Sequence, residues 1–306
     1  MEAQELTDLL DECNTDVQAT LRNLPPVLEV DDPNADDIPG QGSQKWLKIP
    51  KVFAVVADLK NSTQLGTGRH DTSTARAYKS AVEGSVKILN KFEADFIDIQ
   101  GDGGFGLFWG DKAIARAMCA GVTIRTFSQT LVEKLEAQWA PSGGPETGFK
   151  VGIARGRVLV KSLGTPRNPS EQEPVWAGRP VNYATKCAQS ADRHEIVITG
   201  SVWDAIEGND YLAYTCGCTN SPSPNLWSDR TINRLTDDEQ YGRVTGAPWC
   251  VNCGPSFCAA IMAGQRKRTD IPDSARLELS KSQMVESIAK RAQIHRKQRE
   301  AHWQGM

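Results

Sequence analysis

The sequence contains no long hydrophobic run and no leader that combines basic and apolar residues. Among its 306 residues we find no stretch of 18 or more consecutive apolar residues, the length that a transmembrane helix needs. The first residues, MEAQELTDLLDEC, are acidic and lack the basic start and apolar core of a secretory signal. Both absences argue against a membrane-spanning or secreted protein.

The chain also has little excess charge of either sign. Its 35 Lys and Arg against 38 Asp and Glu give a formal net charge of −3. Whole-chain charge therefore does not favour nucleic acid as a partner, and any phosphate-binding cations must be local. Aromatic residues make up only 7%, but 39% hydrophobic and 24% charged residues are typical of one large or two modest globular domains.

Eight cysteines occur without a secretory signal, so we expect reduced thiols or metal ligands rather than disulfides, and a cytoplasmic location. Two thiol pairs stand out within the loop-rich segment 213–258. Four thiolates could hold structural Zn²⁺ tetrahedrally, whereas reduced cysteines also pack as small apolar side chains. The candidate zinc ligands are Cys216, Cys218, Cys250 and Cys253.

The distribution of proline, glycine and charge predicts three parts. Residues 1–45 read as an N-terminal extension and linker, with a short acidic helix over residues 1–24. Residues 46–270 form the main domain, which includes the cysteine-rich segment. Residues 271–306 predict an amphipathic C-terminal helix that carries the basic run HRKQR, most simply a solvated face.

Strand-like and helix-like patterns alternate through the main domain. The expected elements are strand VFAVVAD, a helix over 72–92, strand ADFIDIQ, strand FGLFW, a helix over 112–138, a strand pair FKVGIARGRVLVKSLG bent near Gly156, a helix over 181–190 and strand EIVIT. The order β-α-β-β-α-β predicts an α+β, ferredoxin-like fold, with helices packed on one face of a mainly antiparallel sheet.

Two aspartates lie at the ends of predicted strands. Asp58 ends the first strand, and Asp102 lies at the tip of the hairpin QGDGG. If their strands are neighbours, the two carboxylates converge on shared divalent cations, and hard oxygen ligands suit Mg²⁺ or Mn²⁺. Taken singly, such aspartates are more often cap or turn residues, so the pair becomes informative only with its surroundings.

Four segments appear in an order that resembles the class III nucleotide cyclase domain: AVVADLKNST, FIDIQGDGGFGLFWG, KVGIARGRVLVKSLG and PVWAGRPVNYATKCAQSA. The resemblance covers about residues 52–203. It implies that a ribose 3′-hydroxyl attacks its own α-phosphate and expels pyrophosphate, with two metal ions held by Asp58, Asp102 and the Leu59 carbonyl. Such cations acidify the hydroxyl and neutralise phosphate charge, so no covalent nucleophile is needed. His70 and His194 could still act as acid or base.

The resemblance also implies a triphosphate site. Residues Asn61, Ser62 and Thr63 form a turn that opens onto the helix expected over 72–92, where backbone amides can face phosphate groups. Lys150 stands where the family often has an arginine; lysine keeps the charge but not the bidentate fork.

A second set of residues lies on the predicted helix over 181–190. By resemblance, Asn182 orients the ribose, and Lys186 replaces the family's transition-state arginine. Nearby Arg179 could share that role. A solvated helix lysine is the alternative for Lys186.

The base-reading positions depart from those of adenylyl cyclases. Asp98 and Val175 replace a lysine and an aspartate, and an ionised carboxylate can only accept a hydrogen bond. This argues against ATP and leaves guanine, uracil and cytosine open. Trp176 could form an aromatic wall beside a base with a small ring, or it could simply pack within a strand.

Three features together resemble the bacterial pyrimidine cyclases of antiphage signalling: the segment DLKNST, the acidic base-reading residue and the helix entry WAGRPVN. That resemblance implies synthesis of cyclic UMP or cyclic CMP, recognised by a separate effector. We favour UTP because the N3–H of uracil is the in-plane donor that most nearly matches the N1–H of guanine, which an acidic base-reading residue accepts in guanylyl cyclases.

In the family, one active site takes residues from two cyclase domains. Because this chain carries both sets, the resemblance implies a homodimer with two equivalent sites, and loop 164–176 could cross to the partner. A catalytically inactive module that binds a nucleotide or a partner is the competing hypothesis. Lys186 fits that hypothesis, whereas retention of Asp58, Asp102 and Asn182 favours an enzyme. We expect neither membrane nor nucleic acid as a partner.

Overall fold

The computed structural model describes residues 3–67, 70–139, 143–165, 168–206, 208–235 and 238–304. It divides into two compact units, one from Met1–Ile49 and Leu159–Ala177, the other from Pro50–Val158 and Gly178–Met306. Each unit is described by itself. None of the described helices combines the length and apolarity needed to cross a membrane.

The described elements follow the order α1 (Ala3–Arg22), β1 (Val27–Glu29), η1 (Ala35–Asp37), β2 (Trp46–Leu59), α2 (Ser62–Leu65), α3 (Asp71–Lys91), β3 (Phe96–Gln100), β4 (Gly103–Phe108), α4 (Ala113–Trp139), β5 (Phe149–Gly164), η2 (Pro169–Glu171), β6 (Gln172–Gly178), α5 (Arg179–Ser190), β7 (Ile196–Ile198), α6 (Gly200–Ile206), α7 (Asp210–Ala213), β8 (Ser228–Thr231), η3 (Asp238–Gln240), β9 (Tyr241–Thr245), α8 (Gly254–Met262) and α9 (Asp273–Gln304). From β2 to β7 the order contains the predicted helices α3, α4 and α5 between strands, with α2, η2 and β6 as additional elements.

The sheet has the strand order β3-β4-β2-β5-β7-β9-β8. Four of its pairs, β2–β4, β3–β4, β7–β9 and β8–β9, are antiparallel, and β5–β7 is parallel. The predicted, mainly antiparallel sheet is therefore confirmed. The apolar run of β2 lies in the middle of this order and is almost wholly buried, as expected for a strand covered on both faces.

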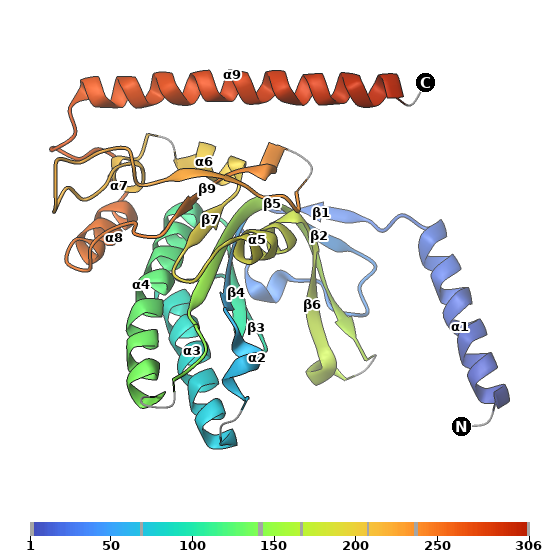
Figure 1. The fold of residues 1–306 in the computed structure, drawn as a ribbon. Coiled ribbons are helices and arrows are strands. Elements are labelled where there is room, and N and C mark those ends of the chain that lie inside the picture. Colours follow the sequence, from blue (N-terminus) through green and yellow to red (C-terminus); the bar gives the residue numbers. More distant parts are fainter. Residues whose placement is uncertain are drawn as a thin grey trace. The chain divides into compact units, whose positions relative to one another are not determined.

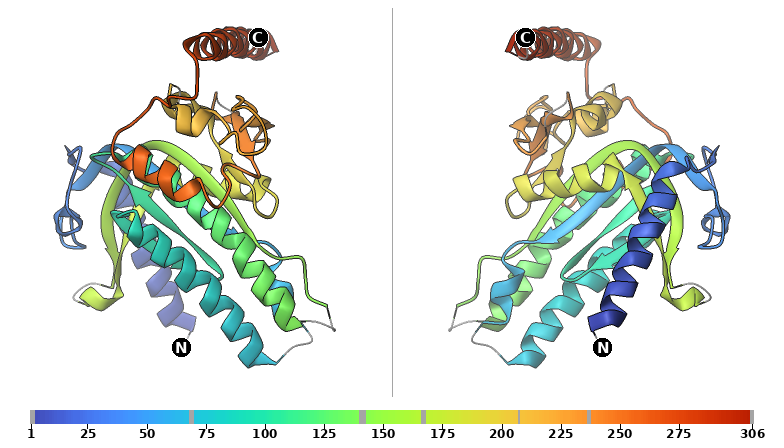
Figure 2. Two further views of the ribbon diagram at one scale, coloured as in Figure 1. Left: turned by 90° about the vertical axis from the view of Figure 1, so that its left-hand side faces the viewer. Right: turned by 90° about the vertical axis from the view of Figure 1, so that its right-hand side faces the viewer.

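Helices cover both faces of the sheet, so the prediction of a single covered face is wrong for α5. Helices α3 and α4 lie side by side on one face (Figures 1 and 2), where Val151 and Ile153 of β5 join their core. The intervening Gly152 faces α5 instead: a Cβ there would lie 1.9 Å from the Ala184 carbonyl oxygen. Successive strand residues face opposite sides, and the missing side chain lets α5 approach the sheet closely.

The segment 149–164 is one strand, not the predicted bent pair. Gly156 makes no turn; a Cβ there would lie 3.3 Å from the Pro180 ring, so the glycine again serves a close helix contact. The hairpin partner of β5 is β6, which begins at residue 172. The predicted loop 164–176 is therefore mainly the turn and second strand of a hairpin, of which residues 166–167 lie outside the described residues.

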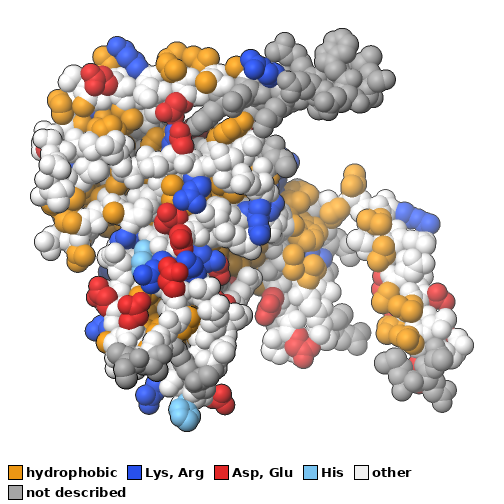
Figure 3. Space-filling view, viewed as in Figure 1, with side chains coloured by type: hydrophobic (Ala, Val, Ile, Leu, Met, Phe, Trp, Pro, Cys, Tyr) orange, Lys and Arg blue, Asp and Glu red, His pale blue; other side chains and the backbone are white. Residues whose placement is uncertain are grey.

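The first unit contains the predicted acidic helix, α1, whose apolar side chains are exposed (Figure 3): Leu6, Leu9, Leu10, Val17 and Leu21. The linker that follows is ordered by backbone pairing. Strand β1 runs parallel to the start of β2, and the Ser162 amide donates to the Pro39 carbonyl (2.8 Å).

The C-terminal helix α9 is formed as predicted, but its expected apolar stripe is not buried. Leu277, Met284, Val285 and Ile288 are all more than half exposed. Leu279 instead packs with a small cluster that includes Tyr214. Most side chains of the run HRKQR lie outside the described residues.

Candidate functional site

The ends of β2 and β5 bring a carboxylate and an ammonium into contact. Asp58 Oδ2 lies 2.5 Å from Lys150 Nζ, and the Lys60 amide donates to the Gly148 carbonyl (3.0 Å) at the same strand ends. The Asp58 side chain is 37% exposed, and that of Lys150 is 18% exposed. The sequence predicts a metal ligand at Asp58 and a triphosphate ligand at Lys150, and the structure places the two side chains side by side.

The hairpin that carries Asp102 lies against the end of β2. Ala57 pairs with Gly104, and a Cβ on Gly103 would lie 2.2 Å from the Ala57 carbonyl oxygen and 3.4 Å from Asp58 Cα. Only glycine allows this approach. The expected neighbourhood of the two aspartates is therefore present, with Asp102 in the turn directly before Gly103.

The strand register places Asp98 on the same face of the sheet as Asp58. Phe105 of β4 pairs with Val56 on one side and with Asp98 on the other, and directly paired residues share a face. Asp58 follows Val56 by two residues and so points the same way. This is the face on which α5 packs, opposite α3 and α4.

Asp98 has a polar partner that sequence analysis missed. Gln100 Nε2 donates to Asp98 Oδ2 at 3.1 Å. The two residues are two positions apart in β3, which is the spacing of neighbours on one strand face. That spacing was the signal available in the sequence.

The loop after Asp58 is held by a network of polar contacts. Asn61 has a left-handed φ of 56°, and its Nδ2 donates to the Glu146 carbonyl at 2.8 Å. Lys60 Nζ contacts both Asp192 (2.5 Å) and Glu146 (3.1 Å). The hydrogen bond to Asp192 raises the pKa of Lys60, and the same bond lowers the pKa of Asp192.

Ser62 and Thr63 begin the four-residue helix α2, so the predicted turn does not open directly onto the long helix α3, which begins at Asp71. Tyr78 of α3 donates its hydroxyl proton to the Ser62 carbonyl at 3.3 Å. Loop 60–63 is thus fixed to neighbouring segments on either side.

Helix α5 buries one side against the sheet; of the residues predicted to act in catalysis, Arg179 and Asn182 are exposed and Lys186 is half-buried. Asn182 is exposed, and its Nδ2 donates to the Gly178 carbonyl at 3.2 Å. Arg179 Cζ lies 5.8 Å and Lys186 Nζ 5.5 Å from the centroid of the Tyr183 ring. Two candidate cations therefore share one aromatic ring. Tyr183 was not predicted as part of the site, although it lies four residues after Arg179 and three before Lys186, spacings that bring helix side chains into contact.

Val175 and Trp176 belong to β6 in the first unit. As adjacent strand residues they point to opposite faces, and their exposure alternates accordingly. The structure therefore does not bring these two predicted base-pocket residues together.

The two candidate histidines differ. His70 precedes α3 and is exposed. His194 Nδ1 lies 2.9 Å from Ser128 Oγ, which accepts a hydrogen bond from the Phe149 amide (2.6 Å). Burial lowers the pKa of His194. His194 thus has a packing role between α4 and β5.

The cysteine-rich segment brings four sulfur atoms together, as predicted. The Sγ atoms of Cys216, Cys218, Cys250 and Cys253 all lie within 4.8 Å of one another, an arrangement that could hold a metal ion. The nearby backbone amide of Cys253 lowers the pKa of the Cys250 thiol to about 7.

Comparison with known proteins yields relatives in sequence and in structure. No family model matches the chain. A uridylate cyclase from Propioniciclava tarda is 56% identical, with 92% of each chain covered. A uridylate cyclase from Micromonospora echinofusca is 46% identical, with 99% of this chain and 98% of the relative covered.

Two solved structures share the fold at low sequence identity. The adenylyl cyclase CyaB from P. aeruginosa has a TM-score of 0.51 at 17% identity, covering 65% of this chain and 95% of that one. A class III adenylyl cyclase-like ATP-binding protein from Pseudomonas aeruginosa has a TM-score of 0.54 at 17% identity, covering 67% of this chain and 45% of that one. The chain belongs to the uridylate cyclase family, built on the fold of the class III nucleotide cyclases.

Proposed function

We propose that the protein converts UTP to 3′,5′-cyclic UMP and pyrophosphate. One observation carries this proposal: Asp58, the Asp102 hairpin and Lys150 meet at one edge of the sheet, where β2 ends, β5 begins and the β3–β4 hairpin turns. The relatives of this chain are named uridylate cyclases. This edge offers carboxylates for cations beside an ammonium for phosphate, the pair of functions that phosphoryl chemistry on a nucleoside triphosphate needs.

The donor set at this edge fits hard divalent cations. Asp58, Asp102 and the Leu59 carbonyl supply oxygen ligands only, which suits two Mg²⁺ or Mn²⁺ ions. Asp58 already attracts a cation, because the Lys150 ammonium lies 2.5 Å from it. Cations held by these ligands would acidify the 3′-hydroxyl and neutralise charge on the α-phosphate and on pyrophosphate. Lys150 then exchanges its carboxylate partner for phosphate oxygens.

The remaining residues orient the nucleotide. The backbone of Asn61, Ser62 and Thr63 receives the triphosphate, and its fixed loop keeps those amides in place. Asn182 holds the ribose, while Lys186 and Arg179 stabilise charge that develops on the α-phosphate. We propose a homodimer in which each site takes its metal ligands from one chain and these α5 residues from the other.

Base selection rests on Asp98. Its carboxylate, oriented by Gln100, accepts the N3–H of uracil. The assignment of Trp176 and Val175 to the pocket wall stays a prediction of the sequence, as does the cytoplasmic location. Cytidylate or guanylate cyclase activity is the alternative for the same acceptor. We further propose a messenger role for cyclic UMP in antiphage defence, through a separate effector.

The test is to incubate the purified full-length protein separately with ATP, GTP, CTP and UTP, with Mn²⁺ or Mg²⁺, and to identify products by mass spectrometry. We expect cyclic UMP from UTP, abolished in Asp58→Asn and Asp102→Asn. Asp111→Asn, which changes an exposed carboxylate in the turn after β4, should keep full activity.

Other products would contradict the base assignment. Cyclic CMP or cyclic GMP as the main product would overturn the choice of uracil and keep the metal site. UTP binding without any cyclic product, with either cation, would favour an inactive nucleotide-binding module. Activity that survives in Asp58→Asn would refute the role of this carboxylate.

A further inference from the structure

The four clustered cysteines lie outside the cyclase site and have no role in the proposed reaction. Cys218 Sγ lies 3.5 Å from Cys250 Sγ and 3.3 Å from Cys253 Sγ, and all four sulfurs lie within 4.8 Å of one another. A tetrahedral zinc site with Zn–S bonds of about 2.3 Å separates its sulfurs by roughly 3.8 Å. We propose that Cys216, Cys218, Cys250 and Cys253 bind one structural Zn²⁺ ion.

The backbone presents each pair of thiols in a tight turn. Gly217, between Cys216 and Cys218, has a φ of +74°, a conformation that glycine adopts without strain. In the second pair, the amides of Cys253 and Gly254 donate to the Cys250 carbonyl at 3.1 and 3.0 Å. Cys253 also begins α8 as its N-cap residue. Both turns place two thiols on one side, as a shared ion requires.

Exposure separates these thiols from cysteines that serve only as apolar packing. Cys119 and Cys187 are buried in the core, which is the alternative role for a reduced cysteine. Cys218 is exposed, and the other three cluster residues are half-buried. Packing in the core therefore does not explain why four thiols converge here from segments 32 residues apart.

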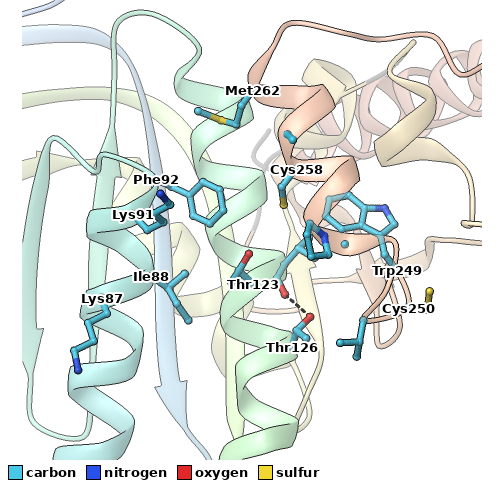
Figure 4. A pocket seen from close by; sticks show the side chains of 15 residues that line it. Lys87, Ile88, Lys91, Phe92, Thr123, Thr126, Trp249, Cys250, Cys258 and Met262 are labelled. Atoms are coloured by element: carbon cyan, nitrogen blue, oxygen red, sulfur yellow. Dashed lines mark hydrogen bonds between the residues drawn. The ribbon is translucent and has the colours of Figure 1, made fainter.

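The ion would join residues 216–218 to the turn that leads into α8. Directly before that turn, the Trp249 indole donates to the Tyr211 carbonyl (2.8 Å) and packs edge-on against Phe257 of α8. Helix α8 packs in turn on α4. Trp249 and Cys250 line a cavity of about 690 Å³ between α3, α4 and α8 (Figure 4). Zinc therefore fixes one wall of this cavity.

Four protein ligands leave no open coordination position, so the site is structural and not catalytic. The first test measures metal content in the purified full-length protein by mass spectrometry. We expect one zinc per chain, and loss of that zinc in Cys218→Ser and Cys250→Ser. Cys13→Ser changes an exposed cysteine of α1 and should keep the metal.

Cobalt substitution tests the ligands without relying on a variant that folds. The wild-type protein, stripped with a chelator and refilled with Co²⁺, should show the intense thiolate-to-cobalt absorption of a tetrahedral four-sulfur site. Absence of both zinc and this spectrum, or a disulfide within the cluster, would overturn the proposal. Bound iron in place of zinc would overturn the choice of metal.

The zinc proposal is independent of the proposed reaction. Asp58→Asn should abolish cyclase activity and keep one zinc per chain. If wild-type protein makes no cyclic nucleotide but contains zinc, the function fails and the metal site stands. If wild-type protein makes cyclic UMP but contains no zinc, the metal site fails and the function stands.

Discussion

The close contact between β5 and α5 makes Gly152→Ala the sharpest test of how the fold supports the site. A Cβ at residue 152 would lie 1.9 Å from the Ala184 carbonyl oxygen and 2.5 Å from the Ala188 amide nitrogen, both in the backbone of α5. Because ordinary contact begins near 3.4 Å, the helix must move away by about 1.5 Å. No side-chain rotation can relieve this clash.

Overpacking of this kind costs typically about 1–3 kcal/mol of unfolding free energy. In a protein of this size each kcal/mol lowers the melting temperature by about 2–4 °C, so we expect a decrease of about 2–12 °C. The same movement displaces Asn182 and Lys186, and a misplacement near 1 Å can lower the rate about 100-fold. Activity should therefore fall by more than the loss of folded protein explains.

The assays are thermal or urea unfolding, together with cyclic UMP formation at a temperature where the variant is fully folded. Gly246→Ala is the matched control, because a Cβ at residue 246 meets nothing within 4 Å and should change neither property. A Gly152→Ala protein with wild-type stability and wild-type turnover would refute the close packing of α5 on β5.

Three further outcomes follow from the described contacts. Burial lowers the pKa of His194, so the unfolded chain binds more protons; the free energy of unfolding should fall as pH decreases from about 7.5 to 5.5, measured by urea midpoints, and less so in His194→Gln. Asp98→Ala should raise KM for UTP about 10- to 100-fold in steady-state kinetics, since a charged hydrogen bond is lost. Lys186→Met should lower kcat about 100- to 1,000-fold, whereas Lys186→Arg should keep activity.

The features that sequence alone predicted are those with a local cause. The apolar run ending at Asp58 specifies a buried strand, and the motif around Asp102 specifies a tight hairpin, because glycine frees the backbone of that turn. The short loops and strong periodicity of residues 71–139 likewise specify their helices locally. The two cysteine pairs, spaced C-x-C and C-x-x-C, likewise suggested a shared site, and their four sulfurs do meet.

The features that the sequence did not predict correctly depend on contacts between segments far apart in the chain. Helical periodicity shows which side of α5 is buried, but not which face of the sheet receives it; that depends on Gly152, whose absent side chain opens the second face. Gly156 predicts a bend by its residue type, although glycine within a strand also marks a close approach of another element. The contact between Asp58 and Lys150 depends on β2 and β5 being neighbours, which no pattern within either segment specifies.

The two faces of the sheet carry different kinds of side chain. The α3–α4 face contributes to an extended apolar cluster whose buried members run from Phe53 to Ile261, and truncation of a leucine in such a core typically costs about 2–5 kcal/mol. The α5 face carries Asp58, Asp98 and Lys150, with glycine at closely packed positions. Substitution of its charged residues leaves that apolar cluster intact. The charged residues of the α5 face can therefore vary with less cost to apolar packing than the residues of this cluster.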